Sequence, residues 1–533
     1  MPATFTRFQR RLFYIFIILL TVPALFVNLG TMAMIDDEAI RALVAMEMDI
    51  SGNYIVPTVN GELYYNKPPL YNWFLLFFYH LFGSYEEWVS RSVTVLCLIG
   101  YAATVFYYSR RHYSTRFAFI NAFFLITCGR ILWYDSMLGL IDLGYSWLTF
   151  TSFMIVYHAG EKRKYGQLFL LTYLLTAAGF LLKGLPSVVF QGATLGAYFL
   201  YRKDWRRLFG SAHFAGIGLF LLIVGSYYIT YHQYHSVADL FDTIVNESTK
   251  RTAAEHGMAD TVKHLFTFPF EFIYHFLPWT ILVVFLFRKD LLKVLAADTF
   301  ITFCCIIFLA DIVVYWVSVE VYPRYLFMHL PLLFTVLLHL YFREENGNGF
   351  ARRLTHIALG MICATAVTAA FVPLFLERAG EESHLFLKCA VPGALLAGLN
   401  ILYYPKKRER LLITVAVLLI ARLLFNWFVI PDRHRHDRGT MVQAAAAEFG
   451  RQYQERPLYF YRGAVMERTT SYYITRESGQ IFRYTDIIKD TAAVYLIQAE
   501  NHPEAEYQKL GEVPVRYGNR RLTIVEDFRR RAE

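Results

Sequence analysis

Three consecutive acids, Asp36, Asp37 and Glu38, directly follow the first long apolar run of the chain, and a lone lysine, Lys67, stands before two prolines further on. A carboxylate can remove a proton from a hydroxyl group, and a lysine can bind an anion. Each residue also has a plainer explanation, because acids stabilise the first turn of a helix and a lysine can extend toward lipid head groups. Three acids together at the edge of an apolar run nevertheless indicate a candidate catalytic site.

Other isolated charges stand close to the ends of later apolar runs. Asp142 lies at or inside the start of one run, and an ionisable residue at membrane depth is a functional candidate by default. The isolated cations are Lys183 and Arg324, close to such ends, and Arg251, in the second long loop at about 232–272. Arg251 follows Glu247 by one helical turn, so these two side chains could simply pair on a helix face. Together the isolated charges form the set that an anion-binding site with a neighbouring carboxylate requires.

The composition is that of a polytopic membrane protein. The 533 residues are 56% hydrophobic and only 18% charged, with a mean hydropathy of +0.35, whereas soluble proteins are about 25% charged. Aromatic residues reach 17%, which suits membrane interfaces. Repeated apolar runs predict thirteen transmembrane helices, at about residues 11–31, 88–108, 117–133, 139–158, 167–183, 185–201, 212–231, 273–287, 297–319, 325–342, 354–376, 385–404 and 411–430.

Basic residues alternate from one linker to the next. The linkers that are rich in Lys and Arg predict a cytoplasmic N-terminus and, with an odd number of spans, a C-terminus on the outer side. No small-residue cleavage site follows the first apolar run, so we expect it to be retained as a span. The net charge of +9 is distributed over these linkers, which argues against a nucleic-acid partner.

The sequence predicts two domains. Residues 1–430 form a transmembrane domain with long outer loops at about 32–87 and 232–272. Residues 431–533 mix a helix-like stretch with strand-like runs, which predicts a small soluble α/β domain outside the membrane. The first outer loop begins with a helical pattern whose apolar residues share one side, and we expect this helix to lie in the membrane interface.

These motifs resemble the large membrane glycosyltransferases called GT-C, above all the bacterial lipid A aminoarabinose transferases and the protein O-mannosyltransferase superfamily. The likeness rests on the acidic pair Asp37-Glu38, the Gly-Asn-Tyr-Ile-Val-Pro turn at 52–57 and the Tyr-Tyr-Asn-Lys-Pro-Pro stretch at 64–69. Weaker likenesses continue to the arginine and proline of 324–331, and the tail resembles the family only in its architecture. The fold class that this implies is an α-helical polytopic membrane protein of GT-C type with a small C-terminal α/β domain.

The resemblance also implies a reaction. The family uses a polyprenyl-phosphate sugar as donor, and direct attack on the sugar carbon inverts its configuration. The acceptor would be a hydroxyl group of a lipid, a glycan or a protein at the outer face of the cytoplasmic membrane. Asp37 would be the general base, with Asp36 as the alternative, and Glu38 or Asp142 would orient the acceptor or the base.

The cations have a separate role in this scheme, which is to hold the donor phosphate and stabilise charge as its bond to the sugar breaks. Lys67 and Arg324 are the first candidates, and Lys183 and Arg251 are the helpers. Many family members carry an acid just before this lysine, and some use it to hold a divalent metal. Here that residue is Asn66. We therefore predict no cofactor, with a divalent metal as the alternative.

A transporter or flippase of a lipid-linked precursor is the alternative function, because it also needs cations for a head group. Transporters tend to show internal repeats and midplane sites, whereas this chain shows no repeat and gathers its isolated charges at one face. A polysaccharide ligase or polymerase also uses polyprenyl donors but usually lacks an acidic pair directly after the first span. A non-catalytic scaffold would be indicated if Asp37 proved dispensable.

Overall fold

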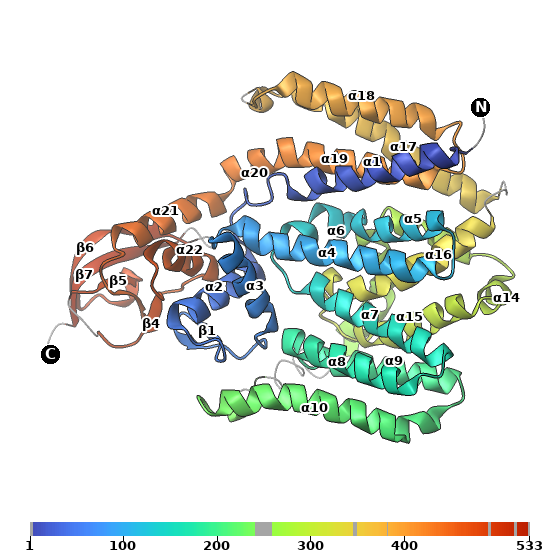
Figure 1. The fold of residues 1–533 in the computed structure, drawn as a ribbon. Helices are drawn as coiled ribbons and strands as arrows, with labels where there is room; N and C mark the ends of the chain where they lie inside the picture. Colours follow the sequence, from blue (N-terminus) through green and yellow to red (C-terminus); the bar gives the residue numbers. More distant parts are fainter. Residues whose placement is uncertain are drawn as a thin grey trace.

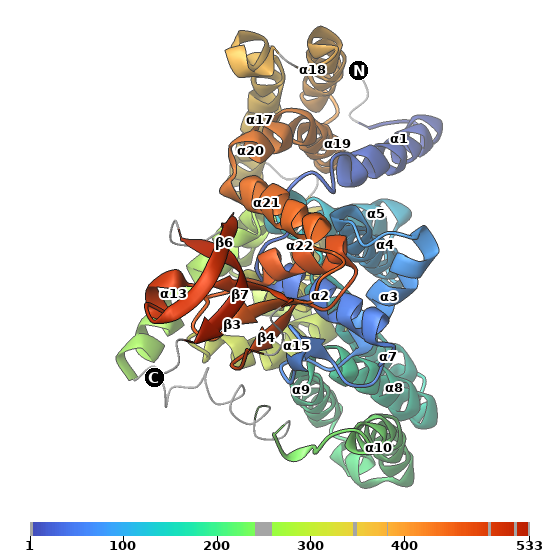
Figure 2. The ribbon, with the colours of Figure 1, turned by 90° about the vertical axis from the view of Figure 1, so that its left-hand side faces the viewer.

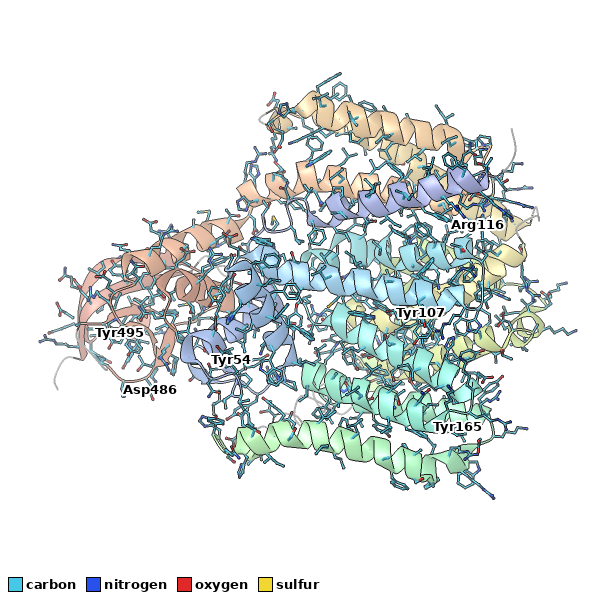
Figure 3. All side chains as sticks on the ribbon, viewed as in Figure 1. Tyr54, Tyr107, Arg116, Tyr165, Asp486 and Tyr495 are labelled. Carbon is cyan, nitrogen blue, oxygen red and sulfur yellow. The ribbon has the colours of Figure 1, made fainter. Side chains whose placement is uncertain are left out.

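The computed structural model describes residues 4–239, 243, 258–344, 349–380, 382–488, 492–515 and 520–530. Long helices run side by side in a bundle, and a small domain that contains the sheet lies at one end of it (Figure 1). The described residues from 438 to 530 form this small domain. We call this end of the bundle the domain end and the other the basic end, because Arg116 and the ends of the basic linkers lie there (Figure 3).

The bundle is built almost entirely from helices. Their bounds are α1 (Arg7–Phe26), α4 (Glu87–Arg110), α5 (Thr115–Ile126), α6 (Gly129–Trp133), α7 (Asp142–Glu161), α8 (Tyr165–Lys183), α9 (Pro186–Tyr201), α10 (Ser211–His232), α13 (Met258–His275), α14 (Leu291–Ala296), α15 (Thr299–Trp316), α16 (Leu330–Arg343), α17 (Phe350–Phe371), α18 (Leu385–Tyr403) and α19 (Arg410–Leu424). Short 3-10 segments join several of them, notably η1 (Asp135–Met137), η3 (Trp279–Leu286), η4 (Pro323–His329) and η6 (Glu377–Ala379).

The predicted membrane architecture is confirmed in kind. Within the described residues, nine helices are long and apolar enough to cross a membrane, or ten if the bent pair of α5 with residues 129–137 is one span. Three further predicted spans, 139–158, 185–201 and 273–287, coincide with α7, α9 and the α13–η3 region, which do not meet the same criterion. The count of thirteen therefore stays a prediction, whereas the multi-pass helical fold is established.

Two short helices and a hairpin connect α1 to α4 at the domain end. They are α2 (Asp36–Ser51), the strands β1 (Thr58–Val59) and β2 (Glu62–Leu63), and α3 (Leu70–Phe82). Gly52, with φ of 69°, adopts the left-handed conformation that ends α2. The acids of the opening motif thus occupy the first turn of a helix, as predicted.

The expectation that the apolar side of α2 faces lipid is wrong. Its apolar residues Leu43, Val44, Met46 and Met48 are fully buried rather than turned toward lipid. They pack between α3 and the C-terminal helix α22 (Arg468–Ser478), which lies directly against α2 (Figure 2). The sequence showed an apolar stripe, and a stripe of this kind fits a protein neighbour as well as a membrane surface.

The C-terminal domain is the α/β domain that the sequence predicted. Its sheet has the order β4-β3-β5-β7-β6, with β3 parallel to β4 and β5 and the other pairs antiparallel. The strands are β3 (Leu458–Tyr461), β4 (Arg483–Thr485), β5 (Val494–Ile497), β6 (Ala505–Pro514) and β7 (Arg521–Arg530), and the helix α21 (Arg438–Gln452) packs with α22. A continuous helical stretch, η7 (Phe425–Val429) and α20 (Ile430–His436), joins α19 to this domain.

Candidate active site

Four of the predicted residues meet at the domain end of the bundle, although they come from four different elements. Arg324 of η4 donates from Nη2 to Oδ2 of Asp37 at 2.7 Å, and its Nε lies 3.5 Å from Oδ2 of Asp142. The ammonium of Lys183, at the end of α8, donates to Oδ1 of Asp142 at 2.6 Å. The result is a continuous chain of ion pairs, Asp37–Arg324–Asp142–Lys183.

The accessibility of these groups differs sharply. The side chain of Asp37 is 49% exposed, whereas the side chains of Arg324, Asp142 and Lys183 are 14%, 6% and 7% exposed. Oδ2 of Asp37 is engaged by Arg324, and no hydrogen bond to Oδ1 is found in the part of the chain that the structure describes. Asp37 is therefore the carboxylate of this group that an incoming hydroxyl can reach.

Aromatic rings enclose the two cations. The Lys183 ammonium lies 4.1 Å from the ring centre of Tyr325 and 4.9 Å from that of Tyr145. The guanidinium of Arg324 lies 4.7 Å from the ring centre of Tyr322. Cations over ring faces are attracted by the ring quadrupole, and the rings also exclude water. The cations are thus held in place and weakly hydrated, which strengthens their attraction for a bound anion.

Glu38 follows Asp37 in α2 but is completely enclosed. Its Oε1 accepts from Arg91 Nη2 at 2.8 Å and from the backbone N–H of Ile35 at 2.9 Å. Its Oε2 accepts from Arg91 Nε at 3.2 Å and from the backbone N–H of Gly139 at 2.8 Å. Of the two predicted roles, orienting an acceptor does not fit this position. Orienting the base does fit, because Glu38 ties the start of α2 to the loop that precedes Asp142.

The remaining predicted residues are placed less completely. Lys67 is partly buried in the loop between β2 and α3. Asp36 is the first residue of α2, and its side chain lies outside the described part of the structure. Arg251 and Glu247 also lie outside the described residues. The roles predicted for Lys67, Asp36 and Arg251 stay predictions.

Sequence reasoning missed two arginines beside the site. Arg91 lies within α4 and pairs with Glu38. A charged residue inside an apolar run was the feature of the sequence that could have identified it. Arg41 lies one helical turn after Asp37 on α2 and donates to the hydroxyl of Tyr64, whose ring centre is 5.1 Å from the guanidinium. The sequence did not single out Arg41, because it lies in a stretch with the pattern of an ordinary amphipathic helix.

Metal ligands are not grouped around the site in the part of the chain that the structure describes. Among the described residues, no three side chains of His, Cys, Asp or Glu converge in a way that could hold a metal ion. Asp135, the other acid near Asp142, is paired with Arg130 at 2.7 Å. The prediction that no divalent metal is required remains a prediction, and transfer measured with and without a chelator tests it.

The far end of α2 carries a second, separate polar cluster around Asp49. Its Oδ1 accepts from His80 at 2.9 Å, and Oδ2 accepts from the hydroxyl of Tyr85. Burial by itself raises the pKa of the Asp49 carboxyl, but hydrogen bonds from Tyr85 and His80 outweigh it, so this pKa lies below its ordinary value of 3.8. Protonation of Asp49 is therefore less favourable in the folded than in the unfolded state.

A depressed folded pKa gives a stabilisation that is present above the unfolded pKa and lost as pH falls through the folded value. We therefore expect Asp49→Asn to lower the unfolding temperature at about pH 6 and the difference from the wild type to narrow below about pH 4. Thermal unfolding of both proteins over this range measures the effect. A difference in unfolding temperature between the two proteins that does not change with pH would contradict the lowered pKa of Asp49.

Comparisons with known proteins bear on this arrangement. A sequence model described as dolichyl-phosphate-mannose-protein mannosyltransferase matches residues 66–230. The chain is 32% identical over 168 residues to an undecaprenyl phosphate-alpha-4-amino-4-deoxy-L-arabinose arabinosyl transferase from Shewanella sediminis, which covers 29% of each protein. An uncharacterised protein from Aquifex aeolicus is 23% identical over 241 residues, which is 44% of this chain and 48% of that one. These matches span less than half of the length of the curated relatives.

Solved structures match over nearly the whole chain. The crystal structures of ArnT from Cupriavidus metallidurans, bound to undecaprenyl phosphate and in the apo state, superpose with TM-scores of 0.69 and 0.64. Each covers 96% of this chain and 97% of ArnT, at 17% sequence identity. The fold is that of ArnT. The resemblance inferred from the motifs is thereby confirmed, and the likeness to ArnT includes the C-terminal domain that the motifs did not cover.

Proposed function

We propose that this protein is an inverting glycosyltransferase that moves a sugar from a polyprenyl-phosphate donor to an acceptor hydroxyl at the outer face of the cytoplasmic membrane. The observation that carries the proposal is the chain of ion pairs from Asp37 through Arg324 and Asp142 to Lys183, which joins an accessible carboxylate to enclosed cations. The likeness to mannosyltransferases that are named for dolichyl phosphate, and to ArnT crystallised with undecaprenyl phosphate, supports the class of donor.

The proposed step needs one base. The acceptor oxygen attacks C1 of the sugar as its proton passes to Oδ1 of Asp37. The bond from C1 to the phosphate oxygen breaks, and the phosphate leaves with the electron pair. A phosphate is already a good leaving group, so no general acid is required, in contrast to glycoside hydrolysis with its two carboxylates. Attack from the face opposite the phosphate inverts the configuration at C1.

The electrostatics of the site fit a phosphate that gains charge. Two carboxylates and two cations balance in the chain of ion pairs, so a bound phosphate calls for further positive charge. Arg41 and Lys67 are the candidates, because Arg41 follows Asp37 by one helical turn and contacts Tyr64, which precedes Lys67 closely in the chain. Enclosed, fixed cations stabilise developing charge without the reorganisation that water requires.

The distribution of basic residues supports the side of the membrane. Arg110 ends α4, Lys162, Arg163 and Lys164 follow α7, and Arg202 follows α9, and these helix ends lie remote from the C-terminal domain (Figure 1). Cytoplasmic ends of membrane helices carry the excess of Lys and Arg. The site and the C-terminal domain would therefore face outward, where a polyprenyl-linked sugar and an envelope acceptor meet.

The test is sugar transfer by the purified protein in lipid nanodiscs. A panel of polyprenyl-phosphate sugars is supplied with envelope extract as acceptor, and nucleotide sugars serve as the control donor. We expect transfer from one or a few polyprenyl donors, no transfer from nucleotide sugars, and an inverted linkage by NMR of the product.

The alternative function, a transporter or flippase of a lipid-linked precursor, gives a different result in the same preparation. It would move a fluorescent polyprenyl-phosphate sugar across a vesicle membrane and release no glycosylated acceptor. Movement without transfer, under conditions in which the protein remains folded, would overturn the glycosyltransferase proposal.

A further inference from the structure

The segment that leads into α2 is held by the C-terminal domain. Residues 27–35 form turns and bends without regular structure, so their backbone groups need partners elsewhere. The N–H of Met34 donates to the hydroxyl of Tyr473 at 2.9 Å, and the carbonyl of Met34 accepts from the hydroxyl of Thr469 at 3.4 Å. Both partners belong to α22 of the C-terminal domain. The domain thus fixes the backbone just before the helix that carries Asp37.

Tyr473 is itself anchored to the membrane bundle. Its hydroxyl donates to Oε1 of Glu87 at 2.7 Å, and the same oxygen accepts from Gln443 of α21 at 2.9 Å. Arg476 of α22 lies 3.2 Å from the other oxygen of Glu87, which is almost completely buried near the start of α4. Three side chains of the domain therefore converge on one buried carboxylate, and this holds Tyr473 in a fixed position relative to the bundle.

The domain also grips the other end of α2, through the hairpin of β1 and β2. Glu47, in the last turns of α2, accepts from the hydroxyl of Thr58 at 2.7 Å and from backbone N–H groups of the hairpin turn. Asn60, in that turn, donates from Nδ2 to the carbonyl of Phe482 at 2.9 Å and accepts at Oδ1 from Arg468 at 3.1 Å. The turn is thus attached to α2 on one side and to the domain on the other.

From these contacts we propose that the C-terminal domain is a positioning element of the active site. It holds α2 at both ends and so sets the carboxylate of Asp37 against Arg324, with Tyr473 and Asn60 as positioning residues that touch neither substrate. This inference rests on the proposed function, because it assumes that Asp37 takes part in the reaction. A displacement of about 1 Å in a reacting group can cost about 100-fold in rate, even when the altered residue lies far from the chemistry.

The test uses one variant at each end of α2 in the full-length protein. Tyr473→Phe keeps the ring and removes the hydroxyl that joins Met34 to Glu87. Asn60→Gly removes the side-chain contacts to the domain and tolerates the left-handed backbone at this position, where φ is 57°. The matched control is Arg456→Gln, which breaks an ion pair with Glu526 inside the domain and leaves its contacts with α2 intact.

We expect kcat to fall about 10-fold in each variant and further in the double variant, on the scale that misplaced groups produce. The KM for the polyprenyl-phosphate donor should change less than threefold, because Arg324 and Lys183, two of the cations proposed to hold the donor, lie on η4 and α8 rather than on α2. Arg456→Gln should match the wild type in kcat and KM.

Unchanged kcat in Tyr473→Phe and Asn60→Gly would overturn the proposal. A raised acceptor KM with unchanged kcat would overturn it too, by assigning the domain to acceptor binding. Failure of the proposed function is recognised separately, because the wild type would then show no transfer at all or Asp37→Asn would transfer at the wild-type rate. If one variant fails to fold, the other still tests the proposal, because the two substitutions lie at opposite ends of α2.

Discussion

Asp37→Asn is expected to lower the rate of sugar transfer by about 100- to 10,000-fold, which is the range for loss of a general base. Asparagine has the size of aspartate and can still accept a hydrogen bond from Arg324, but it cannot take up the proton of the acceptor hydroxyl. The loss should fall on kcat, because neither the cations nor the aromatic rings of the site are altered. Single-turnover transfer from a labelled polyprenyl-phosphate sugar measures it.

Asp290→Asn is the matched control for this prediction. Asp290 precedes α14, has a side chain that is 53% exposed and pairs with Arg288, so it has no part in the chain of ion pairs or in the contacts of α2. The Asp290→Asn variant should transfer sugar at close to the wild-type rate. Wild-type transfer by Asp37→Asn would move the base to another carboxylate, and Asp36→Asn is then the next variant to measure.

Arg324→Gln is expected to reduce kcat/KM by about 100- to 1,000-fold, similar to the loss of one preorganised donor to developing charge. Arg324 is the residue that joins Asp37 to Asp142, so its removal affects both the cation for the phosphate and the position of the base. Arg324→Lys should be intermediate, because an ammonium keeps the charge but lacks the planar fork that reaches two carboxylates at once. Steady-state kinetics with varied donor concentration separate these effects.

The control for Arg324 is Arg378→Gln, which removes an exposed cation in η6 from a loop between two other helices. It should leave donor KM and kcat unchanged. Equal losses in both variants would indicate that general surface charge governs donor binding, and would contradict a specific role for Arg324. A loss in Arg324→Gln that Arg324→Lys fully restores would show that charge alone matters and that the fork does not.

The motifs near the N-terminus determined much of this picture by themselves. Two motifs can be recognised from the sequence alone: the acidic pair directly after the first apolar run, and the lysine before two prolines. Apolar runs and alternating basic linkers predict a helical membrane protein because lipid forces a spanning backbone to satisfy its own hydrogen bonds. Strands in the C-terminal segment could also be predicted, because the alternation of apolar and polar residues and the turn residues between strands are local features of the sequence.

Tertiary structure decided which of these charges belong together. Asp37 and Arg324 are 287 positions apart, and nothing in the spacing of the chain shows that they are partners. It also separated Asp37 from Glu38, since adjacent residues of a helix point in different directions and only one of the two remains accessible. The apolar stripe of α2 predicted that this side of the helix is buried, but it did not predict whether lipid or the C-terminal helix α22 buries it.

Residues whose partners are distant were the hardest to foresee. Tyr473 looks like an ordinary residue of an amphipathic helix, and only the fold shows that its hydroxyl joins Met34 to Glu87. A sequence records local pattern directly, because neighbours in the chain share an element. Contacts between elements depend on how helices pack, and packing is settled by the sum of many weak contacts rather than by any one residue type.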